Sequence, residues 1–234
     1  QTLHIAQLAQ SEAKNQALRN TLLTSVSHDY RTPLANLMGA ASLIHDQTAR
    51  LSTEKITTLA KTVLDEAQHL NRMTSNTLQL ARLDAGPMHV KKDWESLHEI
   101  LGSVLLKARE RYPARQFLVN LPAHLPLIRC NAILLVQLFD NLIENAIKYG
   151  GTQQHITLHI EKLNRFVAIK IADEGPGIDP TERLHIFEKF YRIGSEETRK
   201  QAGSGLGLYI VAEYIRLHDG QIRCLENKPT GSIF

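Results

Sequence analysis

A histidine followed directly by an aspartate is the first pair of residues whose chemistry stands out in the sequence. His28 and Asp29 lie in the run Ser27–Leu34. A neutral imidazole has a nitrogen lone pair that can attack a phosphorus atom, and with an ordinary pKa of about 6.5 most histidine is neutral at pH 7. A nearby carboxylate can hydrogen-bond the other ring nitrogen and accept the proton that is lost on attack. Thr32 lies one helical turn further on the same face, where its hydroxyl can hold a water molecule for the reverse reaction.

Two asparagines and a lysine form a second group of polar residues, on a segment with helical periodicity. Asn141, Asn145 and Lys148 share one polar stripe beside an apolar one. The apolar stripe consists of Leu135, Leu138, Leu142 and Ala146. An amide oxygen is a hard ligand that suits Mg²⁺, and an ammonium group is a point charge that suits phosphate. The alternative is a solvated helix face, for which two asparagines inside a helix are a poor choice.

An aspartate and two glycines follow a predicted strand directly, in the run Asp173–Gly177. An aspartate at the end of a strand can accept a hydrogen bond from the amino group of adenine. Gly175 and Gly177 let the backbone turn sharply beneath the ring. The alternative is an ordinary turn that ends a strand.

A further glycine-rich run opens a predicted helix and contains Gly203, Gly205, Leu206 and Gly207. Glycines at a helix start let backbone N–H groups approach phosphate oxygens, and the helix dipole favours negative charge there. The spacing differs from that of the dinucleotide-binding fingerprint, because Leu208 stands where the third glycine would be. This run is therefore a candidate for phosphate binding.

A long polar segment, residues 178–202, separates the two glycine-rich runs. It is too long for a passive connector and glycines flank it, so we expect a mobile lid. Arg192 lies within this segment and is expected to reach a phosphate.

Long helices must position the histidine, because residues 10–85 carry helical periodicity with almost no glycine. The first apolar stripe consists of Leu23, Val26, Tyr30, Leu34, Leu37, Ala41 and Ile44. His28 points about 160° away from the centre of this stripe, which predicts that it faces solvent. The second stripe consists of Ile56, Leu59, Val63, Ala67, Leu70, Met73, Thr77 and Leu80. Ser52 is a candidate N-cap for the second helix, with Glu54 favourable in its first turn.

Two helices with one narrow apolar stripe each form an antiparallel hairpin that cannot bury its apolar face alone. Pairing with a second copy would give a four-helix bundle, so we expect a homodimer. The alternative is that both stripes pack on the C-terminal part of the chain. The pair Gly86–Pro87 ends the second helix and divides the chain into expected domains of residues 1–86 and 87–234.

Helices and short strands alternate irregularly in the second half of the chain, which predicts a two-layer α/β sandwich. The expected helices span residues 96–111, 133–149 and 206–218. The expected strands span residues 117–121, 156–163, 166–173 and 221–226, and another begins at residue 232.

Composition argues against several other kinds of partner and site. The net charge is +3 and the basic residues are scattered, so we expect no nucleic-acid partner. Cys130 and Cys224 form no CxxC motif and are expected to be reduced, buried thiols. His155 and His159 have no third ligand in view, so no histidine metal site is expected. The sequence has no run of about 18 apolar residues, and we expect membrane attachment only through upstream parts of a longer parent protein.

The run Ser27–Leu34 resembles the H-box of sensor histidine kinases, with Tyr30 where leucine is commonest. The resemblance implies that His28 accepts the phosphoryl group and that Asp29 assists the transfer. It also implies that Thr32 aids dephosphorylation of the partner.

The later runs resemble the N-, G1-, F- and G2-boxes of the same family, in the same order. The N-box resemblance implies that Asn145 ligates Mg²⁺ with support from Asn141. It further implies that Lys148 contacts phosphate and that Tyr149 lies against the base. The G1-box resemblance implies that Asp173 reads adenine.

The F-box resemblance covers Phe187, Phe190 and Tyr191, which anchor one end of the lid, and the G2-box resemblance covers the run Gly203–Leu208. The resemblance extends over residues 15–234. It implies an all-α helical hairpin, dimeric as a four-helix bundle, followed by an α/β two-layer sandwich of the Bergerat type. The implied cofactors are ATP and Mg²⁺.

This resemblance implies ATP-dependent autophosphorylation on His28 and transfer to an aspartate in the receiver domain of a response regulator, with phosphatase activity toward that partner. The runs 19–29 and 92–97 are most similar to potassium-responsive Kdp-type sensor kinases. We therefore expect the cytoplasmic portion of a membrane-anchored bacterial sensor. Two alternatives are a Bergerat ATPase of the chaperone or mismatch-repair type and a dimeric scaffold that binds nucleotide without transferring phosphate.

Overall fold

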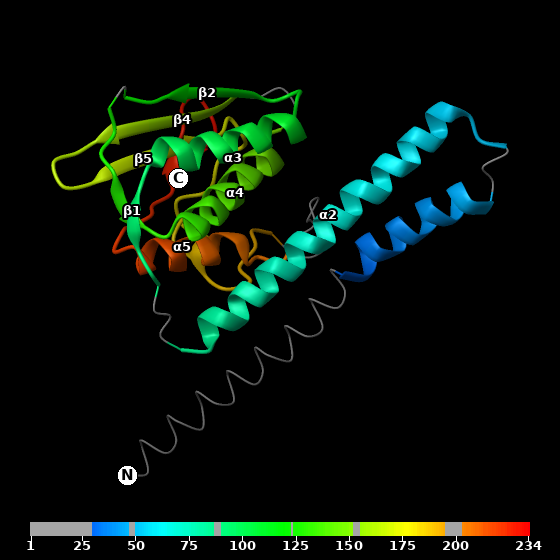
Figure 1. Cartoon of the computed structure of the whole chain (residues 1–234), viewed down its shortest axis with the longest axis horizontal. Helices are drawn as coiled ribbons and strands as arrows, with labels where there is room; N and C mark the ends of the chain where they lie inside the picture. Colours follow the sequence, from blue (N-terminus) through cyan, green and yellow to red (C-terminus); the bar gives the residue numbers. More distant parts are fainter. Residues whose placement is uncertain (1–29, 47–49, 87–89, 123, 152–154, 195–202) are drawn as a thin grey trace, which may run out of the picture. The chain divides into compact units, whose positions relative to one another are not determined.

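The structure is a computed structural model of the chain and describes residues 30–46, 50–86, 90–122, 124–151, 155–194 and 203–234. The chain divides into two compact units (Figure 1). One unit contains residues 1–78 with 202–204, and the other contains residues 79–201 with 205–234. The expected histidine site and nucleotide site therefore belong largely to different units.

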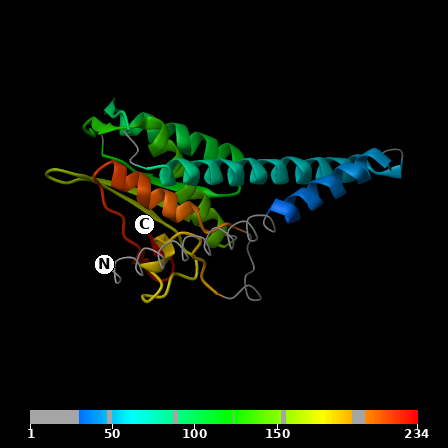
Figure 2. The ribbon, with the colours of Figure 1, turned by 90° about the horizontal axis from the view of Figure 1, so that it is seen from below.

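The first unit contains a helical hairpin. Residues 30–46 are helical and run back alongside the first part of α2 (Thr53–Asp84), as Figures 1 and 2 show. The predicted N-cap is confirmed, because the Ser52 hydroxyl accepts a hydrogen bond from the Lys55 backbone N–H at 3.2 Å. Between the two helices, the Asn36 side-chain amide donates to the Glu66 carboxylate at 3.0 Å.

The first predicted apolar stripe needs a correction. The buried or half-buried side chains of the first helix are those of Tyr30, Pro33, Leu37, Ala40 and Ile44. Leu34 and Ala41, which the periodicity placed in the same stripe, are exposed. In the second stripe Ala67 is exposed, and the other seven predicted positions are buried or half-buried. Apolar residues of the first helix therefore lie both in the contact with α2 and on an adjacent exposed side. The periodicity of the sequence does not distinguish these two sides.

The second unit is built on a five-stranded sheet with the strand order β2-β4-β5-β7-β6. Its strands are β2 (Gln116–Asn120), β4 (His155–Lys162), β5 (Val167–Ala172), β6 (Leu225–Glu226) and β7 (Ser232–Ile233). β2 is parallel to β4, and the remaining pairs are antiparallel. The predicted strand over residues 221–226 is therefore wrong except at its last two residues.

A two-stranded sheet, which the sequence did not predict, pairs β1 (Asp93–Glu95) with β3 (Ile128–Cys130). A short 3₁₀ helix, η2 (His185–Phe187), lies in the segment expected to form the lid. The strands β1 and β3 and the helix η2 have three residues each, which is too short to show a periodicity in the sequence.

Three helices cover one face of the five-stranded sheet (Figures 1 and 2). They are α3 (Leu97–Arg111), α4 (Ala132–Tyr149) and α5 (Gly207–Leu217). Side chains cap the first two, since Ser96 accepts from the Glu99 N–H at 3.4 Å and Asn131 accepts from the Leu134 N–H at 3.1 Å. The inward residues of β4 alternate with outward ones as a half-buried strand requires, and the predicted two-layer α/β sandwich is confirmed.

The two cysteines are buried, as the sequence predicts. Cys130 and Cys224 are free and buried, and burial raises the pKa of each thiol to about 11. His155 and His159 lie on the same face of β4, and no cluster of three potential metal ligands occurs among the described residues. No described helix is long and apolar enough to cross a bilayer.

Candidate nucleotide site

The carboxylate of Asp173 is the best-defined feature of the predicted site. Asp173 follows β5 directly and is 5% exposed. Its Oδ1 accepts hydrogen bonds from the backbone N–H groups of Gly175 at 2.9 Å and Ser232 at 3.2 Å. Burial raises the pKa of this carboxyl, and the two hydrogen bonds oppose that rise without cancelling it. The site therefore holds a poorly solvated carboxylate in one orientation.

Segments from three parts of the sequence meet at this carboxylate. A Cβ atom added to Gly175 would lie 2.6 Å from the Tyr149 carbonyl oxygen at the end of α4. A Cβ atom added to Gly231 would lie 1.9 Å from the Asp173 carbonyl oxygen. Since real Cβ atoms do not approach backbone oxygens so closely, both positions require glycine. The end of α4, the turn after β5 and the turn before β7 are thus packed backbone to backbone.

The polar face of α4 lies beside the first residue of α5. A Cβ atom on Gly207 would lie 3.8 Å from Asn141 Oδ1 and 4.0 Å from Asn145 Nδ2. The predicted amide pair and the predicted phosphate-binding helix start are therefore brought together. Lys148 Nζ lies 4.8 Å from the centre of the Tyr149 ring, and that ring is 49% exposed.

The position of α4 is supported by an acidic residue that the sequence analysis did not single out. Glu144 lies between the two asparagines in sequence and accepts hydrogen bonds from Arg111 at 2.5 Å and from the Tyr112 hydroxyl at 3.0 Å. These bonds tie α4 to the end of α3. Burial also raises the pKa of Asp140, the neighbour of Asn141.

The two ends of the expected lid are joined at their base. The Phe190 N–H donates to the Gly205 carbonyl at 3.0 Å. The edge of one ring of the pair Phe187 and Phe234 contacts the face of the other, with 6.4 Å between the ring centres. These contacts agree with the anchoring expected of the F-box. Arg192 is half-buried, and residues 195–202 lie outside the described residues.

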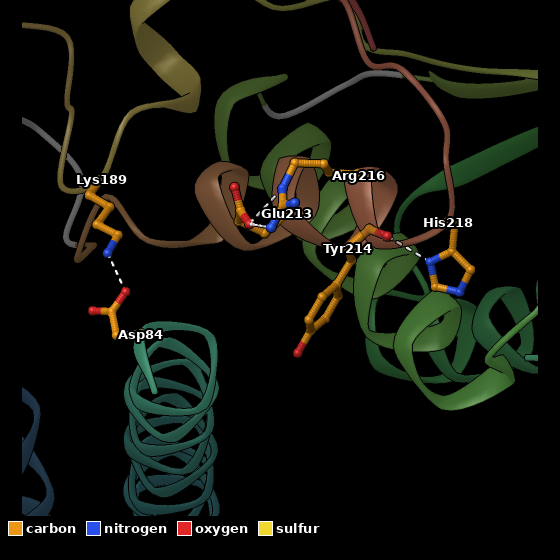
Figure 3. A network of polar contacts seen from close by, with 6 residues as sticks. All are labelled: Asp84, Lys189, Glu213, Tyr214, Arg216 and His218. Carbon is orange, nitrogen blue, oxygen red and sulfur yellow. Dashed lines mark hydrogen bonds and ion pairs between the residues drawn. The ribbon is translucent and has the colours of Figure 1, made fainter. Parts of the chain in front are cut away.

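A lysine next to the lid base makes a contact that sequence reasoning missed. Figure 3 shows Lys189 bonded to Asp84, a residue at the C-terminal end of α2, and Lys189 Nζ also lies 5.0 Å from the centre of the Tyr209 ring. Burial alone would lower the pKa of Lys189, but Asp84 and Tyr209 outweigh it and leave the pKa raised. One side chain thus links the end of α2, the F-box and the first turn of α5.

The end of α5 is fixed to the start of α4 by a histidine. His218 Nδ1–H donates to the Tyr214 carbonyl at 2.6 Å (Figure 3), and His218 Nε2 accepts from the Asn131 N–H at 2.9 Å. Asn131 is also the N-cap of α4. The two helices that carry the polar groups of the site therefore share one anchor.

Not all predicted site residues fall in this region. His28 and Asp29 lie outside the described residues, and Thr32 is exposed on the helix of residues 30–46. Gly177 and Leu206 lie in the second unit, while Gly203 groups with the first.

Sequence reasoning also missed the segment 227–232, which contacts Asp173 through three of its residues. The signal there was Gly231 followed by Ser232 and the apolar pair Ile233–Phe234.

Two protein family descriptions match the chain. Residues 18–86 match the His Kinase A (phospho-acceptor) domain. Residues 130–234 match the histidine kinase-, DNA gyrase B-, and HSP90-like ATPase. The first match contains His28, Asp29 and Thr32, and the second contains the polar face of α4 and both glycine-rich runs.

Individual proteins that are similar to this chain agree with the two family matches. Sensor protein KdpD of Escherichia coli K12 is 35% identical over 228 residues, which are 95% of this chain and 24% of KdpD. The structure of full-length ShkA in complex with AMPPNP is 25% identical with a TM-score of 0.62, over 92% of this chain and 44% of that one.

The structure of the histidine kinase ThkA in complex with the response regulator TrrA is 20% identical. Its TM-score is 0.65 over 100% of this chain and 65% of that one, and it supports the fold alone. The chain spans about a quarter of the length of KdpD. With a phospho-acceptor domain followed by an ATPase domain of the matching kind, the chain belongs to the sensor histidine kinases.

Proposed function

We propose that this chain is an ATP-dependent protein-histidine kinase that phosphorylates its own His28. The observation that carries the proposal is that α4 packs the turn after Asp173 against its end and presents its asparagines beside the first residue of α5, in a chain that also contains a phospho-acceptor domain. A chaperone-type or repair-type ATPase is disfavoured, because the His Kinase A match covers the helix that carries His28.

ATP would be held by groups from four parts of the chain. Asp173 accepts a hydrogen bond from the amino group of adenine, and the exposed Tyr149 ring lies against the base. Lys148 and Arg192 contact phosphate oxygens, together with the backbone N–H groups of the run 203–207, which includes Gly205, Leu206 and Gly207. The nucleotide analogue in the ShkA structure supports this use of the fold.

The two amide side chains of α4 suit a magnesium ion, because an amide oxygen is a hard ligand and both side chains lie beside the start of α5, Asn141 through Oδ1 and Asn145 through Nδ2. Asn145 would be the protein ligand, with Asn141 in support. Bound Mg²⁺ would neutralise charge on the transferring phosphate.

In the transfer step, a ring nitrogen of His28 attacks the γ-phosphorus of ATP. The new bond joins nitrogen to phosphorus, the bond from phosphorus to the bridging oxygen breaks, and ADP leaves. Asp29 accepts the proton released from the imidazole. The phosphoryl group then passes to a carboxylate in the receiver domain of a response regulator, and Thr32 holds the water that later hydrolyses that acyl phosphate. The ThkA–TrrA complex is a solved example of such a pairing.

The functional unit would be a homodimer of the helical hairpin, within proposed domains of residues 1–86 and 87–234. Several large apolar side chains of the hairpin are exposed, namely those of Leu34, Met38, Leu43, Leu64 and Leu78. A second copy would cover such a surface in a four-helix bundle. The identity to KdpD supports a Kdp-type potassium response as the biological role.

The decisive experiment is incubation of the chain with γ-labelled ATP and Mg²⁺. We expect label that is labile in acid and stable in base, and we expect it to disappear in His28→Ala. His45→Ala is the matched control, because His45 is also followed by an aspartate, with Nδ1 2.9 Å from Asp46. The control should keep full labelling. Label that persists in His28→Ala would assign the acceptor to another residue.

A further inference from the structure

An asparagine outside every recognised motif holds the backbone of the base-recognition residue. The side-chain amide of Asn227 donates to the Asp173 carbonyl oxygen at 2.8 Å. The Asn227 Oδ1 accepts from the Lys228 N–H at 3.0 Å, and the Asn227 N–H donates to the Gly231 carbonyl at 3.0 Å. Because one partner is an acceptor and the other a donor, the orientation of the amide is determined by its surroundings.

As a consequence, every polar atom of Asp173 except Oδ2 has a hydrogen-bond partner in the described part of the chain. Its N–H donates to the Ser232 carbonyl at 2.9 Å, and its carbonyl accepts from Asn227. Its Oδ1 accepts from the Gly175 and Ser232 N–H groups. Among the described residues, the hydrogen bonds to this carboxylate therefore end on Oδ1, and Oδ2 is the oxygen left to face a ligand.

Backbone hydrogen bonds also hold the turn that supplies these bonds. Ile171 and Phe234 exchange two of them at 2.9 Å, in addition to the bond from the Asp173 N–H to Ser232. β7 has two residues, and its ladder with β5 consists of the single register pair Ala172↔Ile233. The turn passes so close to β5 that Gly231 has no room for a side chain beside the Asp173 carbonyl. To these backbone bonds Asn227 adds a hydrogen bond from its own side chain to the Asp173 carbonyl, which fixes the peptide group after Asp173 directly.

We propose that Asn227 is a positioning residue for nucleobase selectivity: it fixes the peptide plane at Asp173 so that Oδ2 points at the exocyclic amino group of the purine. This inference rests on the proposed function, in which Asp173 reads that group. Loss of the Asn227 donor lets the turn and the Ser232 N–H move away from Oδ1, so the carboxylate can rotate. Recognition of the amino group then weakens more than binding of the sugar and phosphates.

The test compares two nucleotides by isothermal titration calorimetry in the presence of Mg²⁺. One is ATP, and the other is purine riboside triphosphate, which lacks the amino group. Wild type is expected to prefer ATP by about tenfold or more, since a buried acceptor left unpaired disfavours the analogue. In Asn227→Asp, which keeps the acceptor for the Lys228 N–H and loses the donor, the preference should fall by about three- to tenfold. Affinity for the analogue should change by less than about twofold.

The matched control is Asn164→Asp, the same chemical change at an exposed residue of the β4–β5 turn. It should leave both affinities at the wild-type level. Equal losses for the two nucleotides in Asn227→Asp, or no loss for either, would overturn the positioning role. A wild type that binds both nucleotides equally would instead refute base recognition by Asp173, which is a separate failure.

Circular dichroism and thermal unfolding establish whether each variant is folded. If Asn227→Asp does not fold, Asn227→Ser takes its place, because a serine hydroxyl keeps a short donor near the Asp173 carbonyl. This variant is expected to keep more of the preference for ATP than Asn227→Ala. If Asn227→Ser and Asn227→Ala both prefer ATP over the analogue as strongly as wild type does, the proposal is refuted.

Discussion

Asp173 shows how a single residue can combine a cost in stability with a proposed role in binding. A carboxylate that is 5% exposed has lost most of its water, and its raised pKa reports the free energy lost on burial. Two backbone N–H groups recover part of that loss at Oδ1. Both bonds end on Oδ1, and no hydrogen bond from the described part of the chain reaches Oδ2. The negative charge on Oδ2 is therefore best explained by recognition of a ligand.

Asp173→Asn should therefore separate stability from binding. The asparagine oxygen can still accept from Gly175 and Ser232, whereas its amide nitrogen replaces Oδ2 and repels the amino group of adenine. We expect the affinity for ATP to fall by at least about tenfold while the fold is kept. Calorimetric titration with ATP measures the first effect. An affinity equal to that of wild type would remove Asp173 from the site.

The same substitution predicts a pH dependence. An acid whose pKa is raised in the folded state is most favourable to folding below its unfolded pKa, about 3.9 for aspartate, and this contribution is lost as the pH rises through the raised value. An asparagine side chain does not titrate. The stability of Asp173→Asn relative to wild type should therefore be greatest at neutral pH and should decrease as the pH falls into the acidic range. Urea unfolding at a series of pH values tests the sign, and the reverse trend would contradict the burial argument.

At the scale of elements, the long periodic segments could be predicted from sequence and the short ones could not. α3, α4 and α5 fall within one residue of their predicted limits, because each has an apolar face and a polar end. Residues 221–224 alternate like a strand, yet only Leu225 and Glu226 pair. The limit comes from β7, which the turn over residues 227–231 shortens to two residues, and sequence periodicity does not report the length of a partner strand.

The same contrast holds within the site. Asn141, Asn145, Asp173 and Gly207 could be proposed from sequence because each lies in a compact motif whose residue types suit nucleotide chemistry. Asn227 and Glu144 act through other residues across long separations in sequence, to Asp173 and to Arg111 respectively. Such contacts are properties of the folded backbone, so they became visible only with the structure.

Two glycines make opposite predictions about the elements that contain them. Gly102 lies inside α3 with no atom within 4 Å of an added Cβ, so Gly102→Ala should raise the free energy of unfolding by about 0.5–1 kcal/mol. Gly231 has a φ of +124° and no space, so Gly231→Ala should lower it by about 2 kcal/mol or more. Urea unfolding measures both. A neutral Gly231→Ala would mean that the turn before β7 can move away from Asp173.

The contact between Lys189 and Asp84 predicts a small coupling between the end of α2 and the lid base. Both side chains are partly exposed, so a double-mutant cycle of Asp84→Asn and Lys189→Gln should give about 0.5–1 kcal/mol or less. The pKa of Lys189 is raised, so this stabilisation is complete at neutral pH and is lost only as the pH rises above the unfolded value of about 10.4. Added salt should reduce it. A coupling near zero at low salt would show that the ion pair contributes nothing.

At the scale of the whole molecule, the division into two units assigns the segment that contains the proposed acceptor histidine to one unit and most of the groups proposed to hold ATP to the other. The hairpin has two apolar sides. One is the seam between its own helices, which contains Leu37 and Ala40, and the other is exposed and contains Leu34 and Met38. A hairpin that kept the second side in water would lose the free energy that a bundle core supplies. The exposed side is therefore where a second copy is expected to bind.

Leu34→Glu should consequently weaken the dimer, because the glutamate would place an unpaired charge in the new core. We expect the dimer dissociation constant to rise by about tenfold or more, which sedimentation velocity over a concentration series can measure. Ala35→Glu is the matched control, since Ala35 is exposed and lies about 100° around the same helix from Leu34. It adds the same charge outside the apolar side and should leave the dimer intact. Equal dissociation constants for the two variants, or a wild-type chain that stays monomeric throughout, would show that both helices bury their apolar surface in some other way.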